Sequence, residues 1–200
     1  KSIRLNSATA INVMLVRGPF KVLAAPETME FLRISQQGNN LTIDANFKYN
    51  YQGGRSDYLL YVSCPQLSDF HSDTRYIAGD NVVTDTLASE DFLWRPMVIR
   101  GFSGDSLNIT TDHASNILLE DNHFTKINAQ VGVSKGSASD LTIGLGNQFT
   151  VNHFNILNKS RLWIKGKNEQ SINYRLDDSA RLILNGYIQN DYLKKINPIK

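Results

Sequence analysis

Acidic side chains recur in the central part of this 200-residue chain, where they could do the chemistry of a polysaccharide-cleaving enzyme. Such enzymes place two carboxylates on either side of one glycosidic bond. The acids available for this are Asp105, Asp112, Glu120, Asp121 and Asp140. Aspartate is also a common turn residue, because its side chain hydrogen-bonds to nearby backbone. We therefore predict turn-forming roles and no catalytic residue, and keep a polysaccharide hydrolase or lyase as the enzymatic alternative.

The metal-binding and nucleophilic side chains lack the spacing that their chemistry requires. The histidines are His71, His113, His123 and His153, and none of them forms an HExxH motif. His123 and His153 could approach each other across stacked units, but we predict that they are surface residues. Ser103 lacks the G-x-S-x-G pattern around it. The single cysteine, Cys64, lies in an apolar strand beside Pro65 and is predicted to be a buried small hydrophobe. We expect no metal site and no cofactor.

Aromatic residues are better candidates for ligand contact than any of these groups. Trp163 lies between Leu162 and Ile164, at a position that faces outward if the two aliphatic residues face inward. Tyr174 and Tyr187 follow in the later part of the chain. Exposed aromatic rings stack on sugar rings and form hot spots for protein partners. We predict these three residues as ligand-binding, with packing of Trp163 under a loop as the alternative.

These residues belong to a repeated pattern of two short apolar strands joined by a turn rich in Ser, Asp and Asn. The four strand pairs are 107–109 with 117–119, 131–133 with 141–145, 154–156 with 162–164, and 174–176 with 182–184. The second strands begin at Ile117, Leu141, Leu162 and Leu182, in steps of 24, 21 and 20 residues. This repetition is typical of a β-solenoid, in which each step is one coil stacked on the previous one.

Alternation within the repeats predicts which side chains face inward. In 141–145, Leu141, Ile143 and Leu145 alternate with Thr142 and Gly144, so the aliphatic residues are expected to stack as ladders inside the solenoid. Three asparagines follow second strands in the same phase. They are Asn122, Asn147 and Asn168, and we predict that they form an internal or corner ladder.

The first sixty residues differ from the repeats. Predicted strands at 10–16, 20–23, 30–34, 41–47 and 58–62 alternate with Gly, Pro and Asn turns, and the asparagines at 39 and 40 indicate a hairpin. We predict a single domain, 1–200, with an antiparallel N-terminal cap at 1–62, solenoid coils at 63–186 and a C-terminal tail at 187–200. Short strands are expected near 77, 82–83 and 97–99, and one or two helical turns at 86–92.

Composition excludes several partners. The chain has 21 basic and 19 acidic residues, a net charge of +2, and these charges are dispersed, so it lacks the basic surface that nucleic acid requires. It contains no apolar run of about 20 residues that could span a bilayer as a helix. The chain begins at Lys1 without Met, so we expect that it was trimmed or that a signal peptide was removed.

Three segments are similar to one protein family. The run Gly-Asn-Asn-Leu-Thr-Ile at 38–43, the strand at 59–67 and the closing run Asp-Ser-Ala-Arg-Leu-Ile-Leu-Asn-Gly at 178–186 resemble the autotransporter-adhesin head GIN domain family. The similarity covers about 13–186, although turns such as 158–160 are bulkier than the family's small Gly-Ser turns. The resemblance implies a bacterial exported domain, a right-handed solenoid, and an adhesin-like role without a catalytic motif.

The combined prediction is an all-β protein, a right-handed parallel β-helix with an N-terminal antiparallel strand cap. We expect a non-enzymatic adhesion or binding module that is periplasmic, outer-membrane-associated or extracellular. Its expected partners are a glycan, a surface protein or a second copy of the chain. A structural envelope scaffold is the second alternative to binding, beside the polysaccharide-active enzyme.

Overall fold

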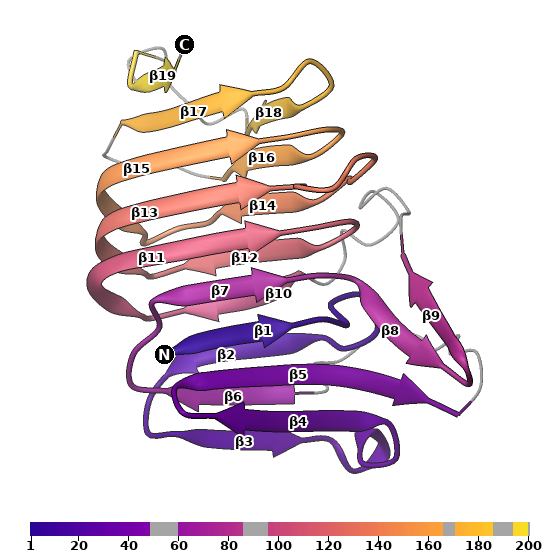
Figure 1. Cartoon of the computed structure of the whole chain (residues 1–200). Helices are drawn as coiled ribbons and strands as arrows, with labels where there is room; N and C mark the ends of the chain where they lie inside the picture. The colour runs from indigo at the N-terminus through magenta and orange to yellow at the C-terminus, as the bar shows by residue number, and fades with distance from the viewer. Residues whose placement is uncertain (49–59, 86–95, 166–170, 186–193, 200) are drawn as a thin grey trace.

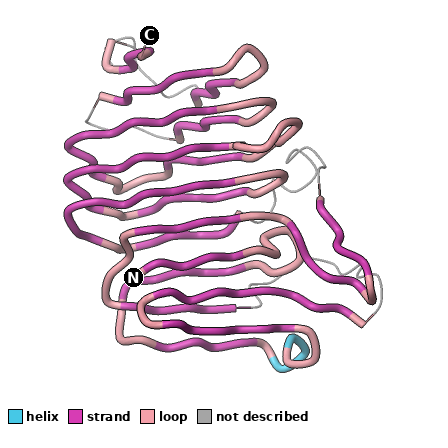
Figure 2. Tube along the Cα trace, in the orientation of Figure 1, coloured by secondary structure: helices cyan, strands magenta, loops and turns pink. Residues whose placement is uncertain are grey.

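The computed structural model describes residues 1–48, 60–85, 96–165, 171–185 and 194–199. The described chain is built from β-strands, and its helical part is a single 3₁₀ turn, η1 (Pro26–Thr28). Figure 2 shows this turn at one end of an array of strands. The all-β prediction is confirmed. The helical turns expected at 86–92 lie outside the described residues.

The strands form two sheets, both with mixed parallel and antiparallel pairing (Figure 1). The larger sheet has eleven strands, in the order β19 (Ile196–Pro198), β17 (Ile172–Leu176), β15 (Gln148–Ile156), β13 (His123–Val131), β11 (Ser103–Thr111), β7 (Asp69–Ser72), β1 (Ser2–Leu5), β5 (Asn40–Phe47), β8 (Arg75–Ala78) and β9 (Asn81–Thr84), with β4 (Leu32–Gln37) also on β5. The smaller sheet has eight, in the order β18 (Arg181–Leu184), β16 (Arg161–Ile164), β14 (Asp140–Ile143), β12 (Asn116–Glu120), β10 (Met97–Arg100), β2 (Val13–Arg17), β6 (Leu60–Cys64) and β3 (Lys21–Ala24).

Successive repeats stack in the predicted register. Ile117 of β12 pairs in parallel with Leu141 of β14, Leu141 with Leu162 of β16, and Leu162 with Leu182 of β18. The steps of 24, 21 and 20 residues therefore each bring a strand beside its equivalent in the preceding repeat. The first strands of the repeats, β11, β13, β15 and β17, pair in parallel in the same way in the larger sheet.

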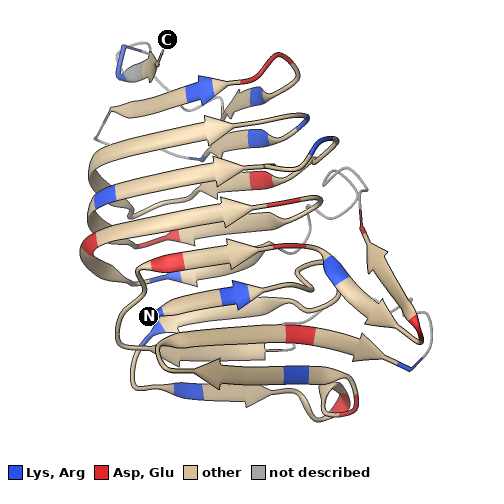
Figure 3. Ribbon diagram, viewed as in Figure 1, with Lys and Arg blue, Asp and Glu red and all other residues tan. Residues whose placement is uncertain are grey.

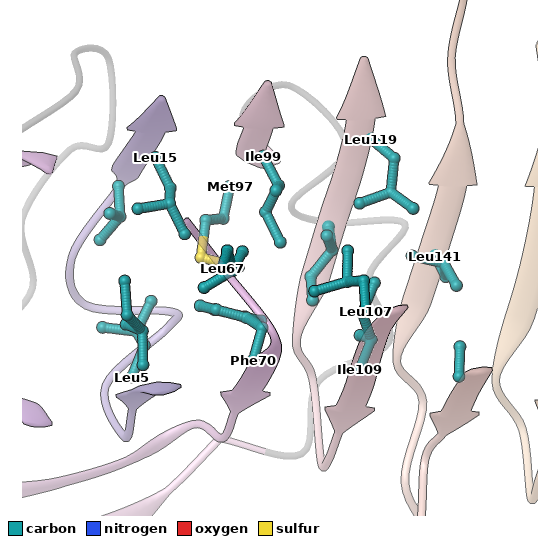
Figure 4. Packing of buried hydrophobic residues seen from close by; sticks show 14 of the residues in the cluster. Leu5, Leu15, Leu67, Phe70, Met97, Ile99, Leu107, Ile109, Leu119 and Leu141 are labelled. Carbon is teal, nitrogen blue, oxygen red and sulfur yellow. The ribbon is translucent and has the colours of Figure 1, made fainter. Parts of the chain in front are cut away.

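The core lies between the two sheets, where the inward residues of both meet. Figure 4 shows Leu107 and Ile109 of β11 pointing toward Leu119 and Leu141 of the smaller sheet. All four are buried, as are the inward residues of β15 and β16, whereas Leu176, Leu182 and Leu184 of the last described repeat are partly buried against the core. This arrangement follows from the period of two in the sequence, because alternate side chains of a strand point to one face.

Two residues of the predicted strand pair at 131–133 and 141–145 do not face inward. Val133 is 44% exposed and Leu145 is 63% exposed, because β13 ends at Val131 and β14 ends at Ile143. Gly146 has a φ of +72° in the turn after β14, and a Cβ atom there would lie 2.0 Å from an Asp121 side-chain oxygen. The chain therefore turns at this point, and the alternation continues in the sequence beyond the end of the strand.

The N-terminal strands correct the prediction of an antiparallel cap. β1 lies between β5 and β7 and pairs in parallel with both, while β2 lies between β6 and β10 and also pairs in parallel. Antiparallel strand pairing is confined, in the described chain, to β3 with β6, β4 with β5 and β8 with β9. The hairpin predicted at 39–40 is confirmed, since Gln37 pairs with Asn40 and Gly38 has a φ of +59°.

Two of the three predicted ladder asparagines form the expected contacts. The Asn122 side-chain amide donates to Asn147 Oδ1 at 3.1 Å and to the Ile99 carbonyl at 2.8 Å, and Asn147 donates to the Leu119 carbonyl at 2.8 Å. Both residues are buried. Their amides satisfy backbone groups where the chain leaves one strand of the smaller sheet and turns toward the larger sheet. Asn168 lies outside the described residues.

Replacement of an inward leucine is expected to destabilise the stack. Leu162→Ala removes a side chain that is 0% exposed, and the resulting cavity should lower the free energy of unfolding by about 2–5 kcal/mol. Leu145→Ala makes the same chemical change at an exposed site and should shift it by less than about 0.5 kcal/mol. Urea denaturation of both variants checks this prediction, and equal effects would contradict the inward assignment.

Candidate ligand-binding cleft

A cleft of about 590 Å³ opens on the larger sheet beside the β8–β9 hairpin. Figure 1 shows this hairpin leaning away from the stacked strands, and Figure 3 shows basic and acidic residues on β1, β4, β5 and β8 around it. The cleft is lined by Arg4, Asn6, Arg33, Asp44, Ala45, Asn46, His71, Asp73, Arg75, Tyr76, Ile77, Val82 and Asp112. Its volume is in the range of pockets that hold small ligands.

The polar floor of the cleft comes from outward positions of adjacent strands. Ile3 and Leu5 of β1 are buried, so Arg4 between them points to the outer face. Arg4 pairs in register with Thr42 of β5 on one side and with His71 of β7 on the other. His71 in turn lies between the buried residues Phe70 and Ser72. A cationic and an aromatic polar side chain therefore lie side by side in the cleft.

An apolar wall faces part of this floor. Ile77 of β8 and Val82 of β9 form a cross-strand pair, and they are 42% and 71% exposed. Tyr76 anchors the hairpin, because its ring packs edge-on against Phe47 of β5 with 5.5 Å between centroids. The cleft thus combines exposed aliphatic surface with hydrogen-bonding groups.

Asp73 connects the hairpin to the strand stack. Its carboxylate lies 2.6 Å from His113 Nδ1 and 3.1 Å from Arg75 Nε, and it accepts the Thr74 N–H at 2.7 Å. Asp73 is buried, and three groups occupy its carboxylate oxygens. This carboxylate is committed to holding the base of β8 in place.

Asp112 is committed in the same way. Burial alone would raise the pKa of its carboxyl, but hydrogen bonds from the Ser134 and Ser137 hydroxyls and from the backbone N–H groups of Ser134 and His113 outweigh burial and lower this pKa to about 2. A glycosidase acid requires a raised pKa, which this environment opposes. Asp112 thus stays ionised and ties two turns together.

His71 remains available in the cleft. Partial burial lowers the pKa of its imidazole, and the charge of Arg4 lowers it further, whereas Asp73 and Asp112 act in the opposite direction. Because the pKa falls below its ordinary value of 6.5, the ring is neutral at neutral pH. A neutral imidazole offers one N–H donor and one acceptor.

The other acids predicted as turn residues are spread over the molecule. Asp140 is buried in a two-point ion pair with Arg161, at 2.6 Å and 2.7 Å. Glu120 and Asp121 both pair with Arg100, and Asp121 has a φ of +53° typical of a tight turn. Asp105 is exposed on β11. These contacts support structural roles for Asp140, Glu120 and Asp121.

The predicted aromatic site residues are not brought together. Trp163 is half-buried on β16 of the smaller sheet; its Nε1 donates to Asn185 Oδ1 at 2.9 Å, and the Lys165 ammonium lies 4.8 Å from its ring. Tyr174 lies on β17 of the larger sheet and packs against the core, in register with buried Phe154. Tyr187 lies outside the described residues.

The remaining candidates are also placed. His123 pairs in register with Gln148 and His153 with Asn128, so the two histidines are not neighbours. Across the described ranges, no group of three His, Cys, Asp or Glu residues could hold a metal ion. Cys64 is buried as predicted, and burial raises the pKa of its thiol. No helix in the described part of the chain is long and apolar enough to cross a membrane.

The cleft itself is absent from the sequence-based prediction. Alternation would have placed Arg4 and His71 on outer faces, but the sequence carries no signal that β1 inserts beside β7. The sequence also did not predict that the β8–β9 hairpin lines a cleft, although the strands near 77 and 82–83 were correctly predicted.

Comparison with solved structures finds proteins of similar fold. A candidate adhesin from Bacteroides fragilis superposes with a TM-score of 0.55 and 12% identity, over 92% of this chain and 88% of that one. A candidate adhesin from Parabacteroides merdae gives a TM-score of 0.36 and 10% identity, over 100% of this chain and 91% of that one. At this identity the first likeness concerns fold alone. No protein-family model and no curated protein matches the chain significantly.

The Asp112 network predicts a specific loss of stability in acid. The folded-state pKa is below the ordinary value of 3.8, so the stabilisation, about 2 kcal/mol, is present above pH 3.8 and is lost as the pH falls through about 2. Asp112→Asn should therefore unfold more easily than the native chain at neutral pH, and the difference should shrink in this acidic range.

Urea denaturation at a series of pH values measures this difference. Asp105→Asn is the matched control, because Asp105 is exposed on the preceding strand, and it should leave the free energy of unfolding almost unchanged. A difference between Asp112→Asn and the native chain that stayed constant down to pH 2 would contradict the assigned pKa.

Proposed function

We propose that this protein is a non-enzymatic binding module of the adhesin type, with the cleft beside the β8–β9 hairpin as its main ligand site. The observation that carries the proposal is the composition of the cleft. It joins exposed aliphatic surface at Ile77 and Val82 to free polar groups, while its carboxylates at Asp73 and Asp112 are occupied by structural contacts. This combination suits recognition of an amphipathic ligand better than cleavage of a bond.

The fold comparison adds support from a second direction. The solved structure with the higher TM-score is described as a candidate adhesin, and its fold extends over most of both chains. The resemblance of 13–186 to the head GIN domain family leads to the same role. On this basis we propose an exported bacterial protein, periplasmic, outer-membrane-associated or extracellular, that binds a glycan or a surface protein.

The finer architecture is part of the same proposal. We propose that residues 1–200 form one domain and that the stacked strands wind as a right-handed β-solenoid. Parallel pairing of every successive repeat in both sheets supports this view. A solenoid provides a rigid frame, which suits a module whose ligand site must be held at a fixed place on its surface.

Trp163 stays a proposed second contact, on the outer face of the smaller sheet. Half-burial and the hydrogen bond to Asn185 fix its ring, and Lys165 beside it adds a donor for a ligand hydroxyl or carboxylate. Tyr174 and Tyr187 are the other proposed contacts. Because Tyr174 packs against the core, its contribution would be to support the fold around any site near β17.

The first experiment is a binding screen with the full chain. Immobilised glycans, matrix proteins and soluble polysaccharides are tested for both retention of the protein and release of cleaved product. We expect saturable retention without product. Product release would favour the hydrolase or lyase, and self-association without any retained surface would favour the envelope scaffold.

Trp163→Ala tests the second contact on whatever surface is retained. Stacking on an aromatic ring contributes about 0.5–1.5 kcal/mol, so affinity should fall about two- to tenfold. Phe20→Ala is the matched control, because Phe20 is an exposed aromatic ring that also has a lysine ammonium over it, at 4.9 Å. Circular dichroism establishes that both variants fold. Equal binding by Trp163→Ala and the native chain would remove Trp163 from the site.

A further inference from the structure

Only some of the charged and polar side chains that line the cleft are free to bind a ligand. Three arginines and three aspartates line it, namely Arg4, Arg33, Arg75, Asp44, Asp73 and Asp112, so its formal charge is zero. Most of these charges already have protein partners. Asp44 accepts the Asn6 amide at 2.6 Å, Arg75 pairs with Asp73, and Arg33 donates to the Glu30 and Leu32 carbonyls.

Arg4 and His71 are the exceptions. Within the described ranges, neither side chain has a hydrogen-bond or ion-pair partner, although both line the cleft. They are register partners on adjacent parallel strands, where equivalent residues are about 4.8 Å apart. The electrostatic effect of Arg4 on His71 reflects this proximity. The unused capacity of the floor is therefore a guanidinium fork with an imidazole beside it.

A carboxylate fits this pair better than other anions do. The planar guanidinium donates two parallel hydrogen bonds to the two oxygens of a carboxylate, and a neutral imidazole N–H can add a third. Because the cleft as a whole has no net charge, it offers little attraction for a group that carries two negative charges, such as a phosphate monoester.

The rest of the ligand must be compatible with the apolar wall. Ile77 and Val82 offer aliphatic surface, whereas Asn6, Asn46 and Asp44 offer polar atoms around it. A pyranose ring has a C–H face and a rim of hydroxyl groups, which match these two kinds of surface. A volume of about 590 Å³ exceeds that of a single ring and leaves room for neighbouring units of a chain.

We propose that the cleft binds a carboxylate-bearing sugar of a glycan, with the carboxylate on Arg4 and His71 and the ring against Ile77 and Val82. This inference depends on the proposed function, because it names the ligand class of the same site. It also predicts selectivity, since the equivalent neutral sugar would leave the Arg4 guanidinium without its partner.

Calorimetric titration of the full chain tests the proposal with defined probes. A galacturonic acid trisaccharide and N-acetylneuraminic acid represent two sources of the carboxylate, and a galactose trisaccharide and a sulfated galactoside serve as the neutral and sulfate-bearing comparisons. We expect at least one carboxylated probe to bind at least tenfold more tightly than both comparisons. Which of the two binds identifies the source.

Variants then place the binding in the cleft. Arg4→Gln should weaken binding of the carboxylated probe at least tenfold, and Arg4→Lys, which keeps the charge but loses the fork, should weaken it less. Arg175→Gln is the matched control. Arg175 is exposed and occupies the position equivalent to Arg4 on another strand of the larger sheet. Register pairing connects the two positions from strand to strand, through His71, Thr110, Gln130 and Asn155. Arg175→Gln should bind like the native chain.

The outcomes separate this inference from the proposed function. The inference is overturned if carboxylated and neutral probes bind equally, or if the sulfated probe binds more tightly. It is also overturned if Arg175→Gln weakens binding as much as Arg4→Gln does. In each case the proposed function as a binding module would stand. Failure of every carboxylated probe while another surface retains the protein would also overturn it. If neither these probes nor any surface in the screen binds, both proposals fail together.

Discussion

Register between stacked strands is the constraint on which the rest of this structure depends. Ile117, Leu141, Leu162 and Leu182 occupy one inward column, and a slip of one residue in any strand would move its aliphatic side chains to the outer face. The column also sets the positions of the outward residues, because inward and outward side chains alternate. Arg4 and His71 are adjacent for the same reason that Ile3 and Phe70 are buried beside each other.

Polar side chains at the turns keep this register. The Asn122 and Asn147 amides bind backbone carbonyls of neighbouring repeats, and the Asp140–Arg161 ion pair joins β14 to β16. Buried polar groups are costly unless they are fully hydrogen-bonded, so such contacts favour one alignment of the repeats over its alternatives. Asp112 and Asp140, which could be mistaken for catalytic groups, instead make contacts that hold neighbouring segments together.

The cleft forms where this regular stacking is interrupted. After β7 the chain leaves the stack as the β8–β9 hairpin, and Asp73 fixes its base through His113 and Arg75. The hairpin adds the apolar pair Ile77 and Val82 to a cleft whose other lining residues come from the outer face of the sheet. A concave site therefore arises on a fold whose repeats, by themselves, produce only ladders and flat faces.

The sequence by itself determined the properties that depend on local periodicity. Alternation identified the inward residues of 107–109, 154–156 and 162–164, the spacing of second strands predicted their pairing, and Asn39 and Asn40 marked a hairpin. These features are legible because a strand repeats every two residues and a turn selects its own residue types.

Only the tertiary structure decided how distant strands meet. It placed β1 and β2 inside the stack, put Trp163 and Tyr174 on different sheets, and ended β14 before Leu145. It also brought Arg4 beside His71 and placed the β8–β9 hairpin so that it lines the same cleft. Parallel strands pair through backbone groups that are the same in every residue, so outside the repeats no local pattern identifies the partners of β1 and β2. The packing of all the inward columns together selects it.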